Sequence, residues 1–146
     1  MMIWTIIIIL LLLILLSAVL YITFNGKYHL MTLASAPSLV NVGAKFKIDI
    51  RIANQCKHDQ IFDMLSLDKK FLDQFIFVGI SPMAKGQASA LGGTCISYQK
   101  QLSPNESMRI ELYFEAIKPG IFIGNFSAIN SKLLTGKAAK VKITVE

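Results

Sequence analysis

The sequence predicts an all-β domain, an antiparallel β-sandwich, preceded by a single N-terminal transmembrane α-helix. Two observations lead to this prediction. The 146-residue chain opens with an apolar stretch, and its first charged residue is Lys27. Beyond Lys27, apolar and polar residues alternate with a period of two, as in strands that bury one face. This second part holds about 120 residues, enough for one domain with a modest core.

Residues 3–20 read IWTIIIILLLLILLSAVL, with Thr5 and Ser17 as the only polar side chains. A helix of about 22 residues spans roughly 33 Å, which matches a hydrocarbon core of about 30 Å. A cleavable signal peptide is the alternative. It would begin with basic residues and carry small residues just after the apolar run, and this chain has neither. We therefore expect residues 1–25 to form a retained membrane anchor.

The strand pattern is clearest in residues 45–53 (KFKIDIRIA), 108–115 (MRIELYFE) and 141–145 (VKITV). In each of these segments every second residue is apolar, so one face of the strand is expected to be buried. Further strands are expected at residues 29–34, 39–42, 61–67, 75–80, 96–102 and 121–128. Seven to nine short strands without a long helix between them indicate an antiparallel sandwich.

Two segments between the strands lack this alternation. Residues 68–74 (DKKFLDQ) are expected to form one helical turn, and residues 83–93 (MAKGQASALGG), with three glycines, are expected to form a mobile loop. The region around the helical turn is rich in aromatic residues. We expect some of these to cap the core and others, together with Trp4, to anchor a protein interface; the candidates are Phe62, Phe71, Phe75 and Phe77.

The order of turns and strands resembles a known family. Residues 38–43 (SLVNVG) precede a strand ending in Asn54, residues 102–107 (LSPNES) precede an alternating strand, and residues 118–120 read KPG. This resembles the immunoglobulin-like modules of prokaryotic membrane-anchored surface proteins, the CARDB type. Asn105 stands where glycine is usual in that pattern, and both residue types tolerate a positive φ.

The resemblance covers most of residues 38–145 and has two implications. It implies an immunoglobulin-like sandwich over residues 38–146, with residues 26–37 as a juxtamembrane segment and first strand. It also implies a place outside the cell, whereas Lys27 alone, counted by the positive-inside rule, favours a cytoplasmic domain. We expect a single-pass protein of the cytoplasmic membrane whose C-terminal domain is extracytoplasmic. The resemblance transfers no catalytic residue.

The two cysteines allow more than one interpretation. In an oxidising compartment Cys56 and Cys95 could form a disulfide that closes a loop of about 40 residues and contributes about 3–4 kcal/mol; otherwise they are two separate thiols. Cys56, His58 and Cys95 also form a weak candidate set of metal ligands. Their spacing lacks a repeated C-x-x-C or H-x-x-x-H pattern, so we expect no bound metal or other cofactor.

No motif for catalysis is present, and the carboxylates alternate with apolar residues as on the wet faces of strands, so we expect a protein that is not an enzyme. The net charge of +6 is diffuse, which argues against nucleic acid as a partner. We expect a membrane-anchored accessory subunit that contacts the lipid bilayer and docks on a larger membrane protein complex. The alternatives are a free-standing adhesion or envelope module and, with less support, a copper delivery protein.

Overall fold

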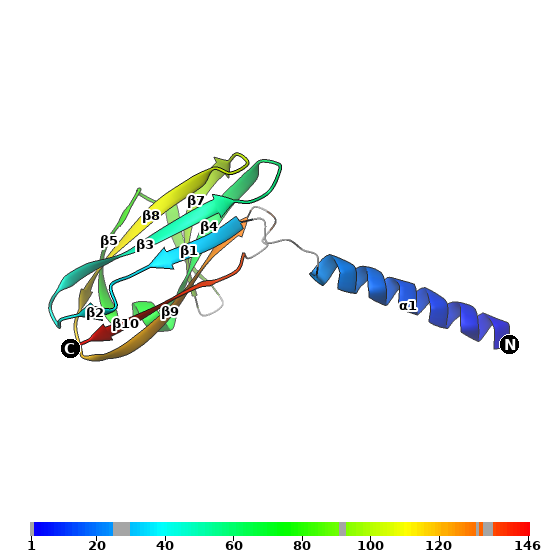
Figure 1. Ribbon diagram of the computed structural model, residues 1–146, viewed down its shortest axis with the longest axis horizontal. Helices are drawn as coiled ribbons and strands as arrows, with labels where there is room; N and C mark the ends of the chain where they lie inside the picture. The colour runs from blue at the N-terminus through cyan, green and yellow to red at the C-terminus, as the bar shows by residue number, and fades with distance from the viewer. Residues whose placement is uncertain (1, 25–29, 91–92, 131, 133–135) are drawn as a thin grey trace.

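The computed structural model describes residues 2–24, 30–90, 93–130, 132 and 136–146 (Figure 1). Helix α1 covers Met2–Phe24 and lies apart from the β-sheets. Its side chains are described for residues 5–20, and all of them are exposed. Among the described residues, which for the side chains of α1 are 5–20, no helix is long and apolar enough to cross a membrane, so the expected transmembrane span is not found in this part of the chain.

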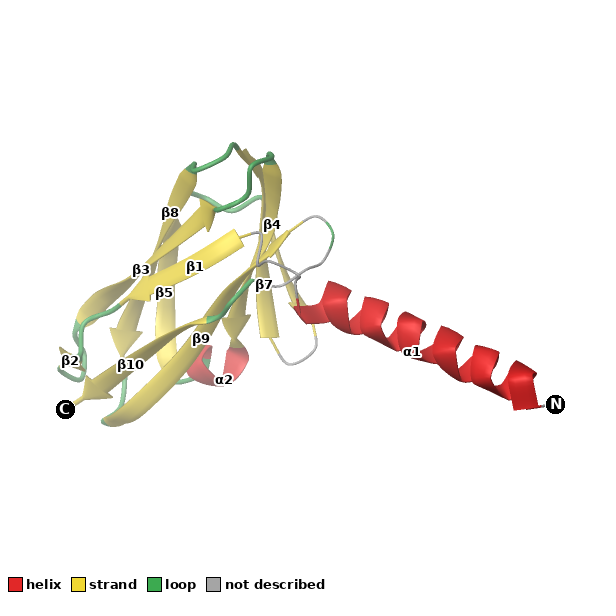
Figure 2. Cartoon of the chain, turned by 45° about the vertical axis from the view of Figure 1, so that its right-hand side comes forward, coloured by secondary structure: helices red, strands yellow, loops and turns green. Residues whose placement is uncertain are grey.

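In the described part of the chain, ten strands form two sheets that pack face to face (Figures 1 and 2). The first sheet has the order β1 (Leu30–Ser35), β3 (Lys45–Asn54), β8 (Ser107–Ala116) and β5 (Phe75–Ser81). The second has the order β2 (Leu39–Val40), β10 (Ala139–Val145), β9 (Gly120–Asn130), β4 (Gln60–Asp68), β7 (Gly93–Leu102) and β6 (Gly86–Ala90). These pairs are antiparallel except for β2 and β10, which run parallel.

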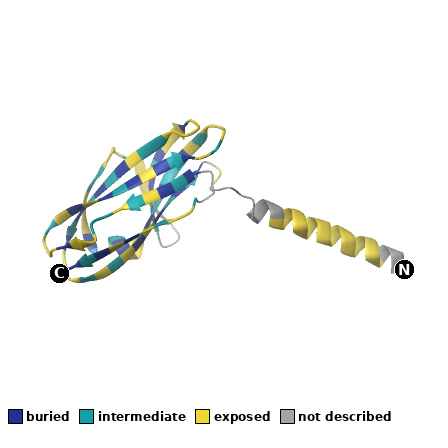
Figure 3. Cartoon of the chain, viewed as in Figure 1, coloured by how far each residue is buried: buried dark blue, intermediate teal, exposed yellow. Residues whose placement is uncertain are grey.

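The alternation in the sequence explains how the sandwich is held together. On β3, Phe46 and Ile50 are buried while Lys45 and Arg51 are exposed, and Figure 3 shows the same alternation on the other long strands. The apolar faces of the two sheets meet and form one hydrophobic core. The expected immunoglobulin-like sandwich is therefore confirmed.

The expected helical turn is also present as α2 (Lys69–Leu72), drawn in red beside β9 in Figure 2. It begins where the carboxylate of Asp68 accepts a hydrogen bond of 3.0 Å from the backbone N–H of Lys70. The helix inserts Phe71 into the core, with its ring centre 4.9 Å from that of Phe75 and 5.7 Å from that of Phe126.

One expectation about the strands is wrong. Within residues 83–93, which the sequence indicates as a mobile loop, residues 86–90 form β6 and pair antiparallel with β7. This strand reads GQASA and forms an edge of the second sheet, so it has no row of large apolar residues to reveal it. A period-two pattern signals only those strands that bury one face.

Candidate interaction surface

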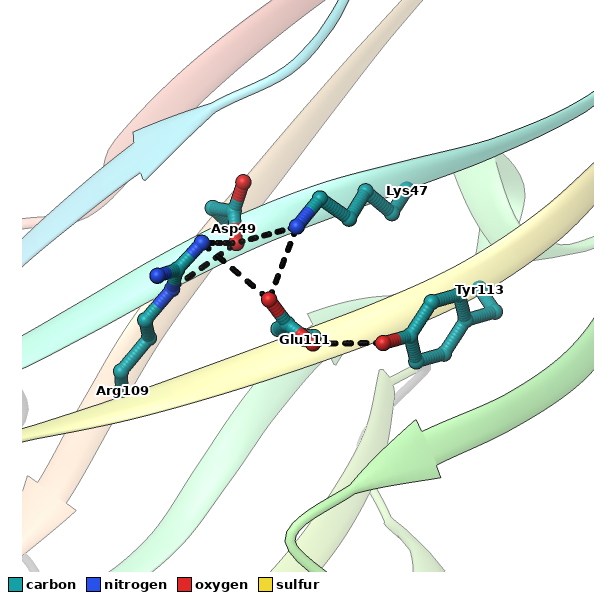
Figure 4. A network of polar contacts seen from close by, with 5 residues as sticks. All are labelled: Lys47, Asp49, Arg109, Glu111 and Tyr113. Atoms are coloured by element: carbon teal, nitrogen blue, oxygen red, sulfur yellow. Dashed lines mark hydrogen bonds and ion pairs between the residues drawn. The ribbon is translucent and has the colours of Figure 1, made fainter.

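The outer face of the first sheet carries a network of charged side chains from β3 and β8 (Figure 4). Lys47 and Asp49 lie on β3, and Arg109, Glu111 and Tyr113 lie on β8. Lys47 Nζ is 2.8 Å from Glu111 Oε1, and Arg109 Nη2 is 2.7 Å from Asp49 Oδ1. Arg109 Nη2 also lies 3.1 Å from Glu111 Oε1, so cations and carboxylates alternate across the two strands.

The electrostatics of this network oppose acid–base chemistry. Hydrogen bonds from Lys47 and Tyr113 lower the pKa of Glu111 to about 2. The bond to the Glu111 carboxylate raises the pKa of Lys47 and of Tyr113, and the bond to Asp49 raises the pKa of Arg109. At neutral pH Glu111 has no proton to donate, and both of its oxygens accept hydrogen bonds. The arrangement joins β3 and β8 at the surface of the sheet, and Glu111 in it is not a general acid at neutral pH.

Hollows on the surface are shallow or lie at an edge. One of about 280 Å³ is lined by Lys45, Lys47, Val78 and Tyr113, beside the charged network. Another, of about 250 Å³, opens between β5 of the first sheet and β6 and β7 of the second, next to α2. Phe77 and Ile96 give this second hollow an apolar part that suits an apolar side chain, and Lys69 and Asp73 supply one charge of each sign to its lining.

The aromatic residues proposed as an interface divide into two groups. Phe62, Phe71 and Phe75 are at most 6% exposed and belong to the core, the place expected for some of these rings, so these three are not available as interface anchors. The physical reason is that these rings fill the space between the two sheets. Phe77, on the edge strand β5, is 45% exposed and remains a candidate. The side chain of Trp4 lies outside the described side chains.

The structure separates the two cysteines, and neither is in a disulfide. Cys95 pairs with Ser66 near one end of the β4–β7 ladder, whereas Leu102 pairs with Gln60 at the other end. Cys56 lies near Leu102, because Asn54 bonds both to the Cys56 N–H and to the Leu102 carbonyl. Seven residues of strand separate Cys95 from Leu102, about 20 Å, and a disulfide needs Cα atoms within about 7 Å. This distance excludes a disulfide between Cys56 and Cys95 in this fold and leaves the alternative of two separate thiols.

The distance between Cys56 and Cys95 also excludes a metal site formed by Cys56, His58 and Cys95. His58 lies in the β3–β4 loop with Cys56, and its backbone carbonyl accepts a hydrogen bond of 2.8 Å from Asn54 Nδ2. Cys95 lies too far away to share an ion with them. In the part of the chain that the structure describes, no group of three or more histidine, cysteine, aspartate or glutamate residues is placed to hold a metal.

The sequence predicts that the charged residues lie on the outer faces of the strands, but it does not predict that they form a network. The alternation shows that Lys47 and Asp49 share one face of β3 and that Arg109 and Glu111 share one face of β8. Which of them meet depends on the register between the two strands, which are far apart in the sequence. The exposed edge of β5 was missed for the same reason, because the order of strands is a property of the folded chain.

Comparison with known proteins shows which type of fold the sandwich has. No family model matches the chain, and a search of curated proteins finds no match. Among solved structures, the CARDB domain of PF1109 from Pyrococcus furiosus is similar, with a TM-score of 0.55 and 11% identity over 82% of this chain and 96% of that one. A cohesin module from Clostridium perfringens, of a family 33 glycoside hydrolase, gives a TM-score of 0.56 and 8% identity over 82% and 98%.

A further likeness, to red sea bream transglutaminase, covers 79% of this chain but only 14% of that enzyme, with a TM-score of 0.53 and 13% identity. At such identities the likeness concerns the fold and carries no activity with it. The strand order, the packed sheets and these likenesses agree with the resemblance seen in the sequence. The chain thus has an immunoglobulin-like β-sandwich fold, similar to that of the CARDB domain of PF1109.

Proposed function

We propose that this chain is a non-catalytic interaction module, held at a membrane by α1 and docked on a larger membrane protein complex through its sandwich. The observation that carries the proposal is the exposure of α1. The large apolar side chains described between Ile6 and Leu20 are all exposed, from 41% at Ile7 to 65% at Leu15. No residue of Met2–Phe24 is charged, so the helix has no polar face to turn toward water.

A helix of this kind needs apolar surroundings, either lipid or the apolar surface of another subunit. Its 23 residues correspond to about 35 Å, compared with a hydrocarbon core of about 30 Å. The anchor confines the sandwich to the membrane surface, which raises its effective concentration for partners located there. The resemblance to prokaryotic surface modules supports an extracytoplasmic position for the sandwich.

The charged network supports a role without catalysis. Asp49 and Glu111 are neutralised by Lys47 and Arg109, and these groups form the main polar feature of the first sheet's outer face. Side chains that neutralise one another position a surface for contact but activate no nucleophile. We therefore assign binding, rather than chemistry, to the sandwich.

The membrane part of the proposal is tested by extraction of the full chain. We expect the wild-type protein to stay in the membrane pellet at alkaline pH. Leu12→Arg together with Leu15→Arg should release it, because each buried arginine costs about 2.5–3.5 kcal/mol in a spanning helix. Leu33→Arg, which changes an exposed leucine of the sandwich, is the matched control and should stay in the pellet. Release of the wild-type protein would overturn the anchor.

The docking part is tested by native electrophoresis after solubilisation in a mild detergent. A subunit of a complex migrates with its partners at a mass well above that of one 16.2 kDa chain. A free-standing adhesion module migrates alone, and that result would replace the accessory-subunit proposal with the adhesion alternative. Impermeant thiol reagents added to intact cells would then report the side of the membrane on which the sandwich lies.

A further inference from the structure

The two edges of the first sheet are protected to different degrees. On one side, β1 is covered by the second sheet: Met31 forms a β-bridge with Lys137, and the Ala128 N–H donates a 3.0 Å hydrogen bond to Thr32 Oγ1. On the other side, β5 pairs with β8, and among the described strands it has no second neighbour in its sheet. The outer edge of β5 therefore presents unpaired backbone donors and acceptors.

The side chains of β5 do little to protect its outer edge. The strand reads FIFVGIS and has no charged residue, and Ile76, Phe77 and Val78 are 49%, 45% and 50% exposed. Edge strands in soluble proteins are usually protected by lysines, prolines or a covering segment. A bulge, which is another protective device, lies between Phe77 and Gly79 and interrupts the pairing with β8, but no charged side chain lies on the strand itself. A bare apolar edge of this kind is a template for an added strand.

The hollow beside this edge is where side chains of an added strand would lie. The hollow lies where Phe77 of β5 faces Gln87 of β6 and Ile96 of β7 in the second sheet. The hollow of about 250 Å³ has four apolar side chains in its lining, and the opposite charges of Lys69 and Asp73 also belong to it; the full lining is Leu67, Lys69, Leu72, Asp73, Phe77, Gln87, Thr94 and Ile96. Phe77 joins the edge to the hollow, because it lies on β5 and also lines the hollow. Its ring packs against Phe114 of β8, with ring centres 5.6 Å apart.

We propose that β5 is a docking edge for an extended, uncharged peptide segment of a partner protein. The segment adds a fifth strand to the first sheet through main-chain hydrogen bonds and directs an apolar side chain into the hollow beside Phe77. This inference rests on the proposed function and gives the chemistry of the partner. Extraction from membranes tests the anchor and peptide binding tests the edge, so either can fail while the other holds.

A second copy of this chain fits the edge less well. If two β5 strands paired across a two-fold axis, each would bring its own Phe77, which already packs on Phe114 of the same copy. Neither hollow would then receive a side chain. Two copies with a net charge of +6 each also repel one another, whereas an uncharged segment does not.

The test uses the full chain in mild detergent and a set of fluorescent peptides of about six residues, in which Val, Ile or Phe alternates with Thr. Fluorescence anisotropy measures binding to the wild type, to Val78→Lys and to Leu33→Lys. The last is the matched control, since Leu33 is 47% exposed on the covered edge strand β1. Circular dichroism confirms folding, and Ile76→Lys replaces Val78→Lys if that variant unfolds.

We expect peptides from the set to bind the wild type and Leu33→Lys equally, and to bind the β5 variant at least about tenfold more weakly. N-methylation of alternate peptide amides should abolish binding, and hydrogen exchange should slow in β5 but not in β1. Three results would overturn the proposal: no peptide binds, the β5 variant binds as well as the wild type, or sedimentation shows a dimer that Val78→Lys dissociates.

Discussion

Asp49 and Glu111 face each other directly across β3 and β8, although both are carboxylates. Like charges in this position destabilise a sheet. Here Arg109 removes the conflict, because its Nη2 lies 2.7 Å from Asp49 Oδ1 and 3.1 Å from Glu111 Oε1. Lys47 lies 2.8 Å from the same Glu111 oxygen, so two cations surround the pair of acids. The stability of this face must therefore depend on pH.

The first prediction concerns acid. The pKa of Glu111 falls from an ordinary 4.5 to about 2 in the folded chain, chiefly through the hydrogen bond from Lys47. A lowered folded-state pKa contributes stability that is complete above the unfolded-state pKa and is lost as the pH falls toward the folded value. We expect the free energy of unfolding of the wild type, measured with urea, to fall between about pH 5 and pH 2.5 by more than that of Glu111→Gln.

Glu115→Gln is the control for this prediction. Glu115 lies on the same strand and faces the same side as Glu111, opposite Lys45. Because Glu115→Gln leaves the contacts of Glu111 intact, the variant should keep the loss of stability that Glu111 causes in acid. If Glu111→Gln and the wild type lose equal stability over that range, the carboxylate of Glu111 does not stabilise the fold in the way that its contacts indicate.

The second prediction concerns the contact between Gly124 and Phe71. A Cβ atom added at Gly124 would lie 2.7 Å from Cγ and 2.8 Å from Cδ2 of the buried Phe71 ring. The ring is held between β5 and β9 and has little room to move, so Gly124→Ala should lower the free energy of unfolding by about 1–3 kcal/mol. Gly86→Ala, where an added Cβ meets nothing within 4 Å, should change it by less than about 0.5 kcal/mol. Equal effects of the two substitutions in urea unfolding would contradict this packing.

The third prediction concerns Asn54, the buried residue that ends β3. Its Nδ2 donates to the carbonyl oxygens of His58 and Leu102 at 2.8 and 2.9 Å, and its Oδ1 accepts from the Cys56 N–H. Asn54→Asp keeps the shape of the side chain but replaces the Nδ2 amide group, which donates both hydrogen bonds, by an oxygen. The carbonyl oxygens of His58 and Leu102 would then face a buried negative charge. We expect a loss of at least about 1–3 kcal/mol in thermal or urea unfolding at neutral pH.

An exposed asparagine gives the comparison for Asn54. Asn125 lies on the outer face of β9, and Asn125→Asp should leave stability within about 0.5 kcal/mol of the wild type. A loss at Asn125 as large as that at Asn54 would show that added negative charge, rather than the missing donors, causes the effect.

The sequence predicted the individual strands well, but it did not show which strands pair with one another. The alternation from Lys45 to Asn54 fixes which side chains of β3 are buried, because neighbouring residues of a strand face opposite sides. The same logic failed for β6, whose small residues carry no apolar signal. It also could not show that Phe77 is half-exposed while Phe75 is buried, since that difference depends on an edge formed by strands distant in sequence.

The fourth prediction follows from the distance between Cys56 and Cys95. Cys56 lies near Leu102 at one end of the β4–β7 ladder and Cys95 lies near the other end, so no rotamer change can join them. Denatured, unreduced protein should therefore take up alkylating reagent at both cysteines, with the same mass before and after treatment with reductant. Cys95→Ser should lose one label and keep its stability in urea within about 0.5 kcal/mol, as expected where no bridge is broken. A label that appears only after reduction would require a register of β7 different from the one in this structure.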